Sequence, residues 1–234
     1  MQARLAGALL VLACDAALAA AGTSSPSDPY IEFLWSKTPE GALARQETRS
    51  FVLGERFGHQ VCVAVLDADA TTSGLTIEMR DTAGRVVAQQ AHPDFDGSKR
   101  CFPAQLPPDA TPGTWRVVVY LDGAAAPAGS REVEVYPTLD ALIAATPQDM
   151  PYVLGRPNYD ATIAPEAFVG ELAWVMHIAP DGSVDRVEIE RAEGIGLQIR
   201  DRAIRAGEIS LFPPRSGTDS TSTFRRQLSF RNDE

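Results

Sequence analysis

The chain has 234 residues, of which 44% are hydrophobic and 22% are charged, a mixture typical of one or two globular domains. This composition argues against wholesale disorder and against a membrane protein with many spans. With 31 acidic and 21 basic residues the formal charge is −10, so repulsion from phosphate backbones makes nucleic acid a poor partner.

The N-terminus has the features of a bacterial secretory signal. A basic start precedes the apolar run Leu5–Ala13, which is too short to cross a bilayer. Cleavage after Ala17-Leu18-Ala19 removes a signal peptide of residues 1–19. The alternative is a lipobox that ends at Cys14 and places a lipid on that cysteine. Both routes predict export to the periplasm, soluble or lipid-anchored, with the membrane contacted only through Cys14.

The three cysteines are Cys14, Cys62 and Cys101. Removal or lipidation of Cys14 leaves a pair, and in an oxidising compartment such a pair predicts a Cys62–Cys101 disulfide. The alternative is two buried free thiols in separate strands. The sequence contains no CxxC and no Cys/His cluster, so it predicts neither a zinc site nor thiol-redox chemistry.

Residues 20–29 are rich in serine and proline and predict a flexible leader. Residues 30–136 then predict an all-β domain, because apolar runs of strand length recur between turn signals. The clearest runs are Gln60–Leu66, Leu75–Arg80, Thr114–Leu121 and Arg131–Tyr136. Short strands separated by Gly, Pro and Asp turns predict an Ig-like β-sandwich.

Leu139–Ala145 has helical spacing and is followed by two prolines, which predicts a helical linker over residues 137–156. In residues 157–234 we first expect a β-hairpin, with strands over Glu171–Ile178 and Val184–Glu190 and a tight turn at Asp181-Gly182. A turn at Glu193–Gly196, a helix over Leu197–Arg205 and a final strand are expected to follow. We place Leu197, Ile199, Ala203 and Ile204 on one stripe of that helix. This order predicts a small α+β domain made of a β-hairpin, a helix and a strand.

The same elements, with Pro157-Asn-Tyr159, Pro180-Asp-Gly182 and Phe212-Pro-Pro214, resemble the C-terminal domain of TonB-type energy transducers and related TonB/TolA modules. The resemblance covers residues 157–234. It implies a periplasmic domain that binds partners through an open sheet edge. The 17 prolines are scattered and form no long spacer, so we do not expect force transduction from the inner membrane.

The resemblance maps the family's last strand onto residues 223–231, which we predict to be a partner-binding edge. It comprises Thr223, Phe224, Arg225, Arg226, Gln227, Leu228, Ser229, Phe230 and Arg231. Alternation places its two phenylalanines and its leucine on one face, and the absence of proline leaves the backbone free to pair with an added strand. The two arginines either contact an acidic partner or form a charged edge that discourages aggregation.

The sequence predicts no catalytic residue, no cofactor and no metal site. The three histidines, His59, His92 and His177, are far apart, and no nucleotide-binding or nucleophile motif occurs. We therefore expect a non-catalytic exported envelope protein whose partner is an outer-membrane receptor or another periplasmic protein. Two alternatives stay open: a component of TonB-dependent, energy-coupled transport across the outer membrane, and a carbohydrate-binding or cell-envelope enzyme accessory protein.

Overall fold

The computed structural model describes residues 29–39, 41–54, 57–65, 74–121, 123–157, 168–215 and 222–230. The predicted signal peptide, Cys14 and nearly all of the predicted leader lie outside these residues, as does Arg231.

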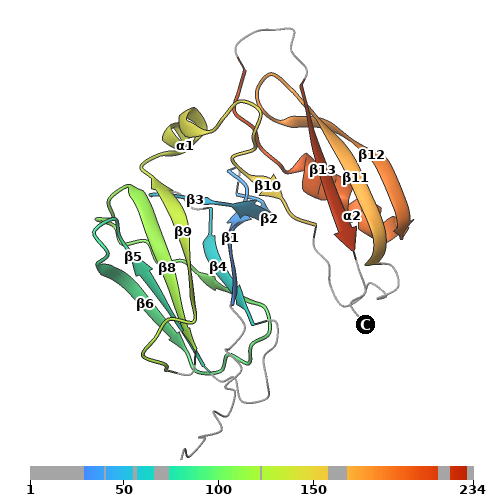
Figure 1. The fold of residues 1–234 in the computed structure, drawn as a ribbon. Helices are drawn as coiled ribbons and strands as arrows, with labels where there is room; N and C mark the ends of the chain where they lie inside the picture. Colours follow the sequence, from blue (N-terminus) through green and yellow to red (C-terminus); the bar gives the residue numbers. More distant parts are fainter. Residues whose placement is uncertain are drawn as a thin grey trace, which may run out of the picture.

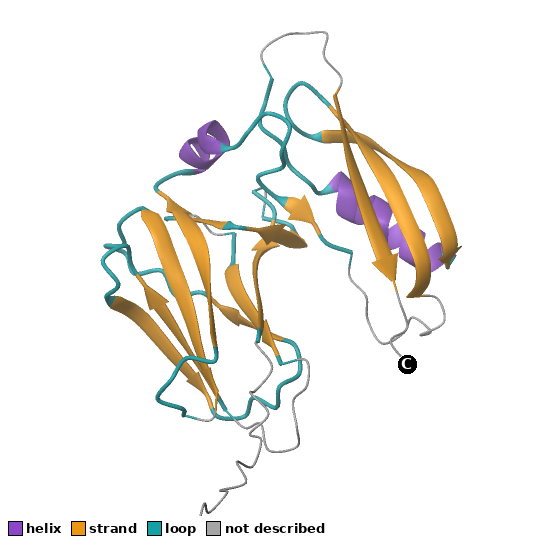
Figure 2. Ribbon diagram, in the orientation of Figure 1, coloured by secondary structure: helices purple, strands orange, loops and turns teal. Residues whose placement is uncertain are grey.

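The protein is mostly β-structure. Of the described residues, 53% are in strands and 11% in helices, and the strands form two five-stranded sheets and one three-stranded sheet (Figures 1 and 2). The predicted fold class, an all-β Ig-like sandwich followed by a small α+β domain, is therefore wrong.

Two features account for this difference. In the C-terminal region a single helix, α2 (Leu197–Glu208), accompanies three long strands, so helix is the minor component there. In the N-terminal region the first sheet takes a strand, β10 (Leu154–Gly155), from the predicted linker, so residues 30–136 do not supply all of their own strands. A two-residue strand leaves no periodic pattern in the sequence, because a distant partner determines its conformation.

The first sheet has the strand order β10-β2-β1-β4-β7. Its longest member, β1 (Tyr30–Lys37), lies in the centre, between β2 (Leu43–Thr48) and β4 (His59–Ala64). The edge strands are β7 (Arg100–Pro103) and the short β10. All neighbouring strands in this sheet are antiparallel.

The second sheet has the order β3-β9-β8-β5-β6. Its strands are β3 (Ser50–Val52), β5 (Leu75–Arg80), β6 (Val86–His92), β8 (Gly113–Leu121) and β9 (Gly129–Tyr136). β3 runs parallel to β9, and the other pairs are antiparallel. The alternation in Leu75–Arg80 is confirmed, since every second residue of β5 is buried.

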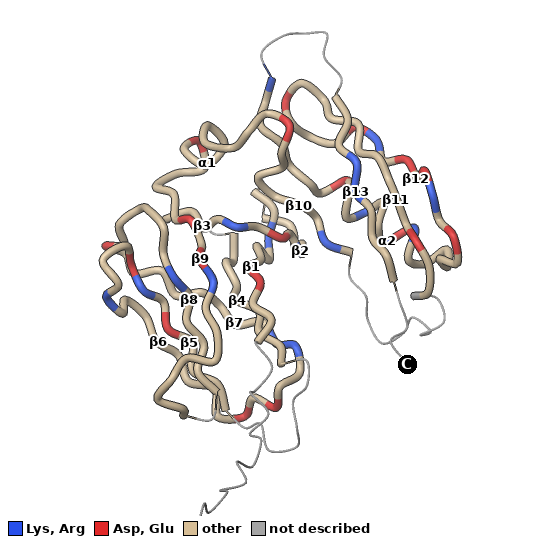
Figure 3. The backbone as a smooth tube through the Cα atoms, viewed as in Figure 1, with Lys and Arg blue, Asp and Glu red and all other residues tan. Residues whose placement is uncertain are grey.

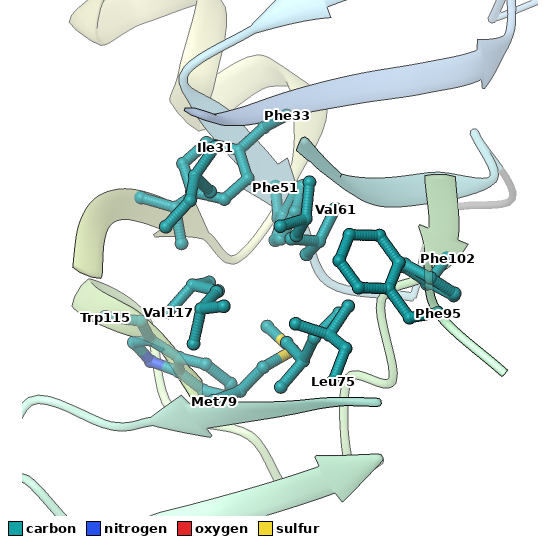
Figure 4. Packing of buried hydrophobic residues seen from close by; sticks show 14 of the residues in the cluster. Ile31, Phe33, Phe51, Val61, Leu75, Met79, Phe95, Phe102, Trp115 and Val117 are labelled. Atoms are coloured by element: carbon teal, nitrogen blue, oxygen red, sulfur yellow. The ribbon is translucent and has the colours of Figure 1, made fainter. Parts of the chain in front are cut away.

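The first two sheets share one hydrophobic core (Figure 4). Side chains of the first sheet meet those of the second there, and the fully buried members include Phe33, Val61, Met79, Trp115 and Val117. A second, smaller cluster joins this region to the chain that follows it. It consists of Trp35, Val52, Phe57, Leu142 and Val153. Leu142 lies on α1 (Leu139–Ala145), whose N-terminus is capped by the Thr138 hydroxyl, as expected of a helix at this position.

The third sheet has the order β12-β11-β13, and α2 covers one of its faces (Figure 2). β11 (Phe168–Ile178) is central, with β12 (Val184–Ile195) and β13 (Ser222–Phe230) on either side, both antiparallel to it. The tight turn at Asp181-Gly182 is confirmed: Gly182 has φ 88°, and the Asp181 carboxylate accepts the Ser183 N–H at 2.9 Å.

Two local predictions in this region are wrong. The segment predicted as a turn around Glu193 belongs to β12. The pairing of β12 with β11 continues past a β-bulge and ends where Ile195 lies opposite Phe168. The predicted stripe of α2 is wrong for Leu197, which is 75% exposed, and confirmed for Ile199 and Ala203, which are buried together with Ala206 and Gly207. Leu197 is the first residue of the helix, so it lies beyond the part of α2 that packs on the sheet.

The predicted disulfide is confirmed. Cys62 on β4 lies directly opposite Cys101 on β7, and the bond links residues 39 apart in sequence. Cys62 is completely buried. The crosslink therefore fastens the edge strand β7 to the inner strands of the first sheet.

Reduction of this disulfide is expected to lower the free energy of unfolding by about 2–4 kcal/mol, because a closed loop of this length restricts the unfolded chain. Urea titrations with and without reductant measure the loss, with a Cys62→Ala/Cys101→Ala variant as a control for effects of reductant elsewhere. Non-reducing peptide mapping of protein taken from the cell tests the bond directly, and recovery of two alkylatable thiols would contradict it.

Candidate functional site

β13 is an edge strand along its whole length. Its nine residues pair with β11 from Ser222 opposite Ile178 to Phe230 opposite Gly170. No other strand among the described residues pairs with β13, as the order of the sheet shows. One row of backbone N–H and C=O groups is therefore left without a strand partner in the part of the chain that the structure describes.

The side chains of β13 alternate strictly between the two faces of the sheet. Phe224, Leu228 and Phe230 are half-buried and pack against the cluster formed with α2, as the sequence predicts. The cluster includes Leu172, Trp174, Met176, Ile199, Ala203 and Phe212. Thr223, Arg225, Gln227 and Ser229 are exposed on the opposite face. This packing fixes the strand on one face and leaves the other face in solvent.

The adjacent arginines point to opposite faces and have different roles. Arg226 points inward and its side chain is only 16% exposed. It donates to the Gly155 carbonyl oxygen at 3.0 Å, lies 3.6 Å from a Glu47 carboxylate oxygen and places its guanidinium 5.6 Å from the centre of the Trp174 ring. Arg226 therefore joins β13 to β10 and β2, which argues against its predicted role as a contact for a partner.

Arg225 lies on the exposed face and reaches across β11 to Glu190 on β12, with Nε 2.6 Å from the carboxylate oxygen. Further ion pairs on this face join Arg186 to Glu188 and Arg191 to Glu171. Acidic and basic residues thus alternate along β12 (Figure 3). The face of the sheet opposite α2 is charged, whereas the open row of β13 backbone groups lies at its side.

A cavity of about 460 Å³ lies beside the Phe224 end of β13. Its lining combines Phe224 with residues of the N-terminal region and of the segment that carries α1 and β10, among them Arg49, Tyr136, Met150 and Leu154. Met150 is 48% exposed. The structure thus brings together an open strand edge and a partly apolar hollow. The sequence offered no signal for this juxtaposition, since the lining residues come from distant segments.

The sequence matches no protein-family model and no curated protein. Among the residues that the structure describes, neither helix has the length and apolar composition needed to span a bilayer. Within the same residues, no group of three or more His, Cys, Asp or Glu side chains is placed to hold a metal ion.

Proposed function

We propose that this is a non-catalytic protein of the bacterial cell envelope that binds a protein partner by strand addition to β13. The open edge of β13 supports this proposal: nine residues without a proline are paired on one side only. A partner strand placed there would form backbone hydrogen bonds on the side of β13 that faces away from β11. The TonB-type resemblance of residues 157–234 suggests the same mode of binding and remains an expectation from the sequence.

The envelope location is proposed on two grounds. The apolar N-terminal run is typical of an export signal. The Cys62–Cys101 disulfide belongs to an oxidising compartment, because cytosolic reductants keep such pairs reduced. An outer-membrane receptor or another periplasmic protein is then the expected class of partner.

Amide hydrogen exchange is expected to show a period of two along Ser222–Phe230. Amides that bond to β11 should exchange slowly, and the alternate amides that point away from it should exchange fast. Binding of a strand should slow the second set and leave the first nearly unchanged. NMR exchange rates measure this residue by residue.

The partner for that measurement can be captured with a photo-crosslinking residue at Gln227, which is exposed on β13. Asp185, exposed on β12 at the other edge of the sheet, is the matched control position. We expect one discrete envelope protein to crosslink at Gln227 and not at Asp185. If the purified protein binds without slowing the fast amides of β13, strand addition at this edge is wrong.

A further inference from the structure

The cavity of about 460 Å³ beside β13, here called the Phe224 hollow, lies between two hydrophobic clusters. Phe224 and Leu154 line it and pack against the cluster that α2 forms with the third sheet. Tyr136 and Tyr152 also line it and pack against the cluster around Trp35. An apolar group placed in the hollow would therefore be removed from water by side chains of both clusters, which stabilises its binding.

The lining of the Phe224 hollow is mainly apolar. Nine of the fourteen described residues around it are apolar or aromatic. Met150 is 48% exposed, and Leu154 and Phe224 are half-buried, so part of this apolar surface is in contact with solvent in the free protein. The acidic residue in the lining, Glu47, lies 3.6 Å from Arg226. A recess of this size and composition favours an uncharged, bulky group over an ion.

The hollow lies on the open side of β13. Phe224 is the contribution of β13 to the lining, and none of the described lining residues comes from β11 or β12. The strand order β12-β11-β13 therefore places the hollow at the outer edge of the third sheet and not under its centre. Figure 1 shows the chain between α1 and β10, which carries Met150 and Tyr152, passing the start of β13. Phe224 points to the α2 face, so the hollow continues that face outward.

A strand added to β13 would run about 4.8 Å from it, and residues directly opposite each other would share a face. The partner residue opposite Phe224 would therefore point to the α2 face and towards the hollow. The next partner residue on that face would lie opposite Arg226. The Arg226 guanidinium donates to the Gly155 carbonyl oxygen at 3.0 Å and lies over the Trp174 ring, so that place is occupied. The position opposite Phe224 is thus where an added strand has an apolar recess to fill.

We propose that the strand which a partner adds to β13 anchors one bulky apolar side chain, such as leucine or phenylalanine, in the Phe224 hollow. The anchor is the partner residue opposite Phe224. This inference rests on the proposed strand addition and states which chemistry the added strand must carry. Backbone pairing gives affinity to any extended segment, whereas a pocket for one side chain selects among segments. Strands with a charged or small residue at the anchor position should bind more weakly.

The probe is a phage-displayed library of random peptides longer than the nine residues of β13, selected on the immobilised full chain. Amide hydrogen exchange then identifies the peptides that slow the fast amides of β13, which are those that add a strand. We expect these peptides to share a bulky apolar residue at one position. Replacement of that residue by alanine should weaken binding about tenfold, as measured by calorimetry.

Met150 offers a test of where the anchor lies. Met150→Glu places a charge at the exposed rim of the hollow and should weaken binding of the selected peptides about tenfold. Val86→Glu is the matched control, because Val86 is also 48% exposed but lies on β6, in the second sheet. Met150→Leu keeps an apolar side chain and should bind like wild type. Alanine at the anchor position should cost less affinity on Met150→Glu than on wild type, since the two changes affect one contact.

The outcomes separate the anchor from strand addition itself. Peptides that slow the β13 amides but share no apolar position would overturn the anchor and leave strand addition standing. If no selected peptide slows those amides, both proposals fail together. The anchor is also overturned if Val86→Glu weakens binding as much as Met150→Glu, or if Met150→Leu weakens it as much as Met150→Glu.

Discussion

Replacement of Gly155 by alanine is expected to destabilise the protein by about 2–3 kcal/mol, the upper end of the usual range for overpacking. A Cβ atom at this position would lie 1.8 Å from the Ala206 carbonyl oxygen and 2.7 Å from Cγ1 of Ile209. The first contact is with helix backbone, so no side-chain rotation relieves it. Gly155 and α2 would have to move apart.

That movement would disturb every hydrogen bond made by the Gly155 peptide groups. The Gly155 N–H donates to the buried Ser210 hydroxyl at 2.9 Å, and its carbonyl accepts from Arg226. We therefore expect the Gly155→Ala variant to loosen the contact between the first sheet and α2 as well as to lose stability. Urea unfolding monitored by circular dichroism measures the stability change.

Gly41→Ala is the matched control, because a Cβ there meets nothing within 4 Å and only the positive φ of 87° opposes it. Its expected cost is about 1 kcal/mol, from left-handed backbone alone. A Gly155→Ala variant no less stable than Gly41→Ala would show that β10 and α2 are not in the close contact described.

Acidification is expected to remove about 3 kcal/mol of stability through His59. Burial among Trp35, Phe51 and Phe57 lowers the pKa of this histidine from 6.5 to about 4. Its Nε2 accepts the Val52 N–H at 2.9 Å, a bond that only the unprotonated nitrogen makes. The folded state therefore holds neutral imidazole at pH values where the unfolded chain binds a proton.

The sign follows from that difference in bound protons. Above pH 6.5 His59 is neutral in both the folded and the unfolded chain, and its contribution to the free energy of unfolding is fully present. That contribution is lost as the pH drops from 6.5 towards 4, and below about 4 His59 causes no further loss of stability. Chemical denaturation at a series of pH values measures the slope.

His59→Gln keeps an acceptor for the Val52 N–H but cannot titrate, so its stability should depend less on pH in this window. Burial also lowers the pKa of His92, which is more exposed than His59. The His92→Gln variant is therefore the control for the smaller contribution of His92 to the pH dependence of stability. Equal slopes for wild type and His59→Gln would rule out the role given to His59.

Sequence patterns predicted the parts of the fold that depend on local alternation. Leu75–Arg80 and Thr223–Phe230 alternate between polar and apolar residues and form strands with alternating burial. The disulfide was predicted from the number of cysteines, because the predicted removal or lipidation of Cys14 leaves two. The two strands were predicted correctly because a short stretch of chain contains the alternation that determines them.

Features that depend on distant partners had no local signal in the sequence. β1 contains a charged residue, Glu32, within the apolar run Ile31–Trp35, and its burial is understandable only once Lys99 and Arg156 are placed beside it. Alternation in a strand allows only one of the adjacent Arg225 and Arg226 to point inward but does not say which. The partners of Arg226, Glu47 and Gly155, lie in other segments.

The late position of β10 in the chain has a consequence for synthesis. Residues 154–155 emerge after every other strand of the first two sheets, so until then the outer edge of β2 has no strand beside it. Val153, which precedes β10, is also needed to complete the cluster around Trp35. A nascent chain that ends at Tyr136 thus exposes both an open edge and apolar side chains, the two features that promote aggregation. The proposed export of the chain in an unfolded state, followed by folding of the whole chain at once, would avoid that intermediate.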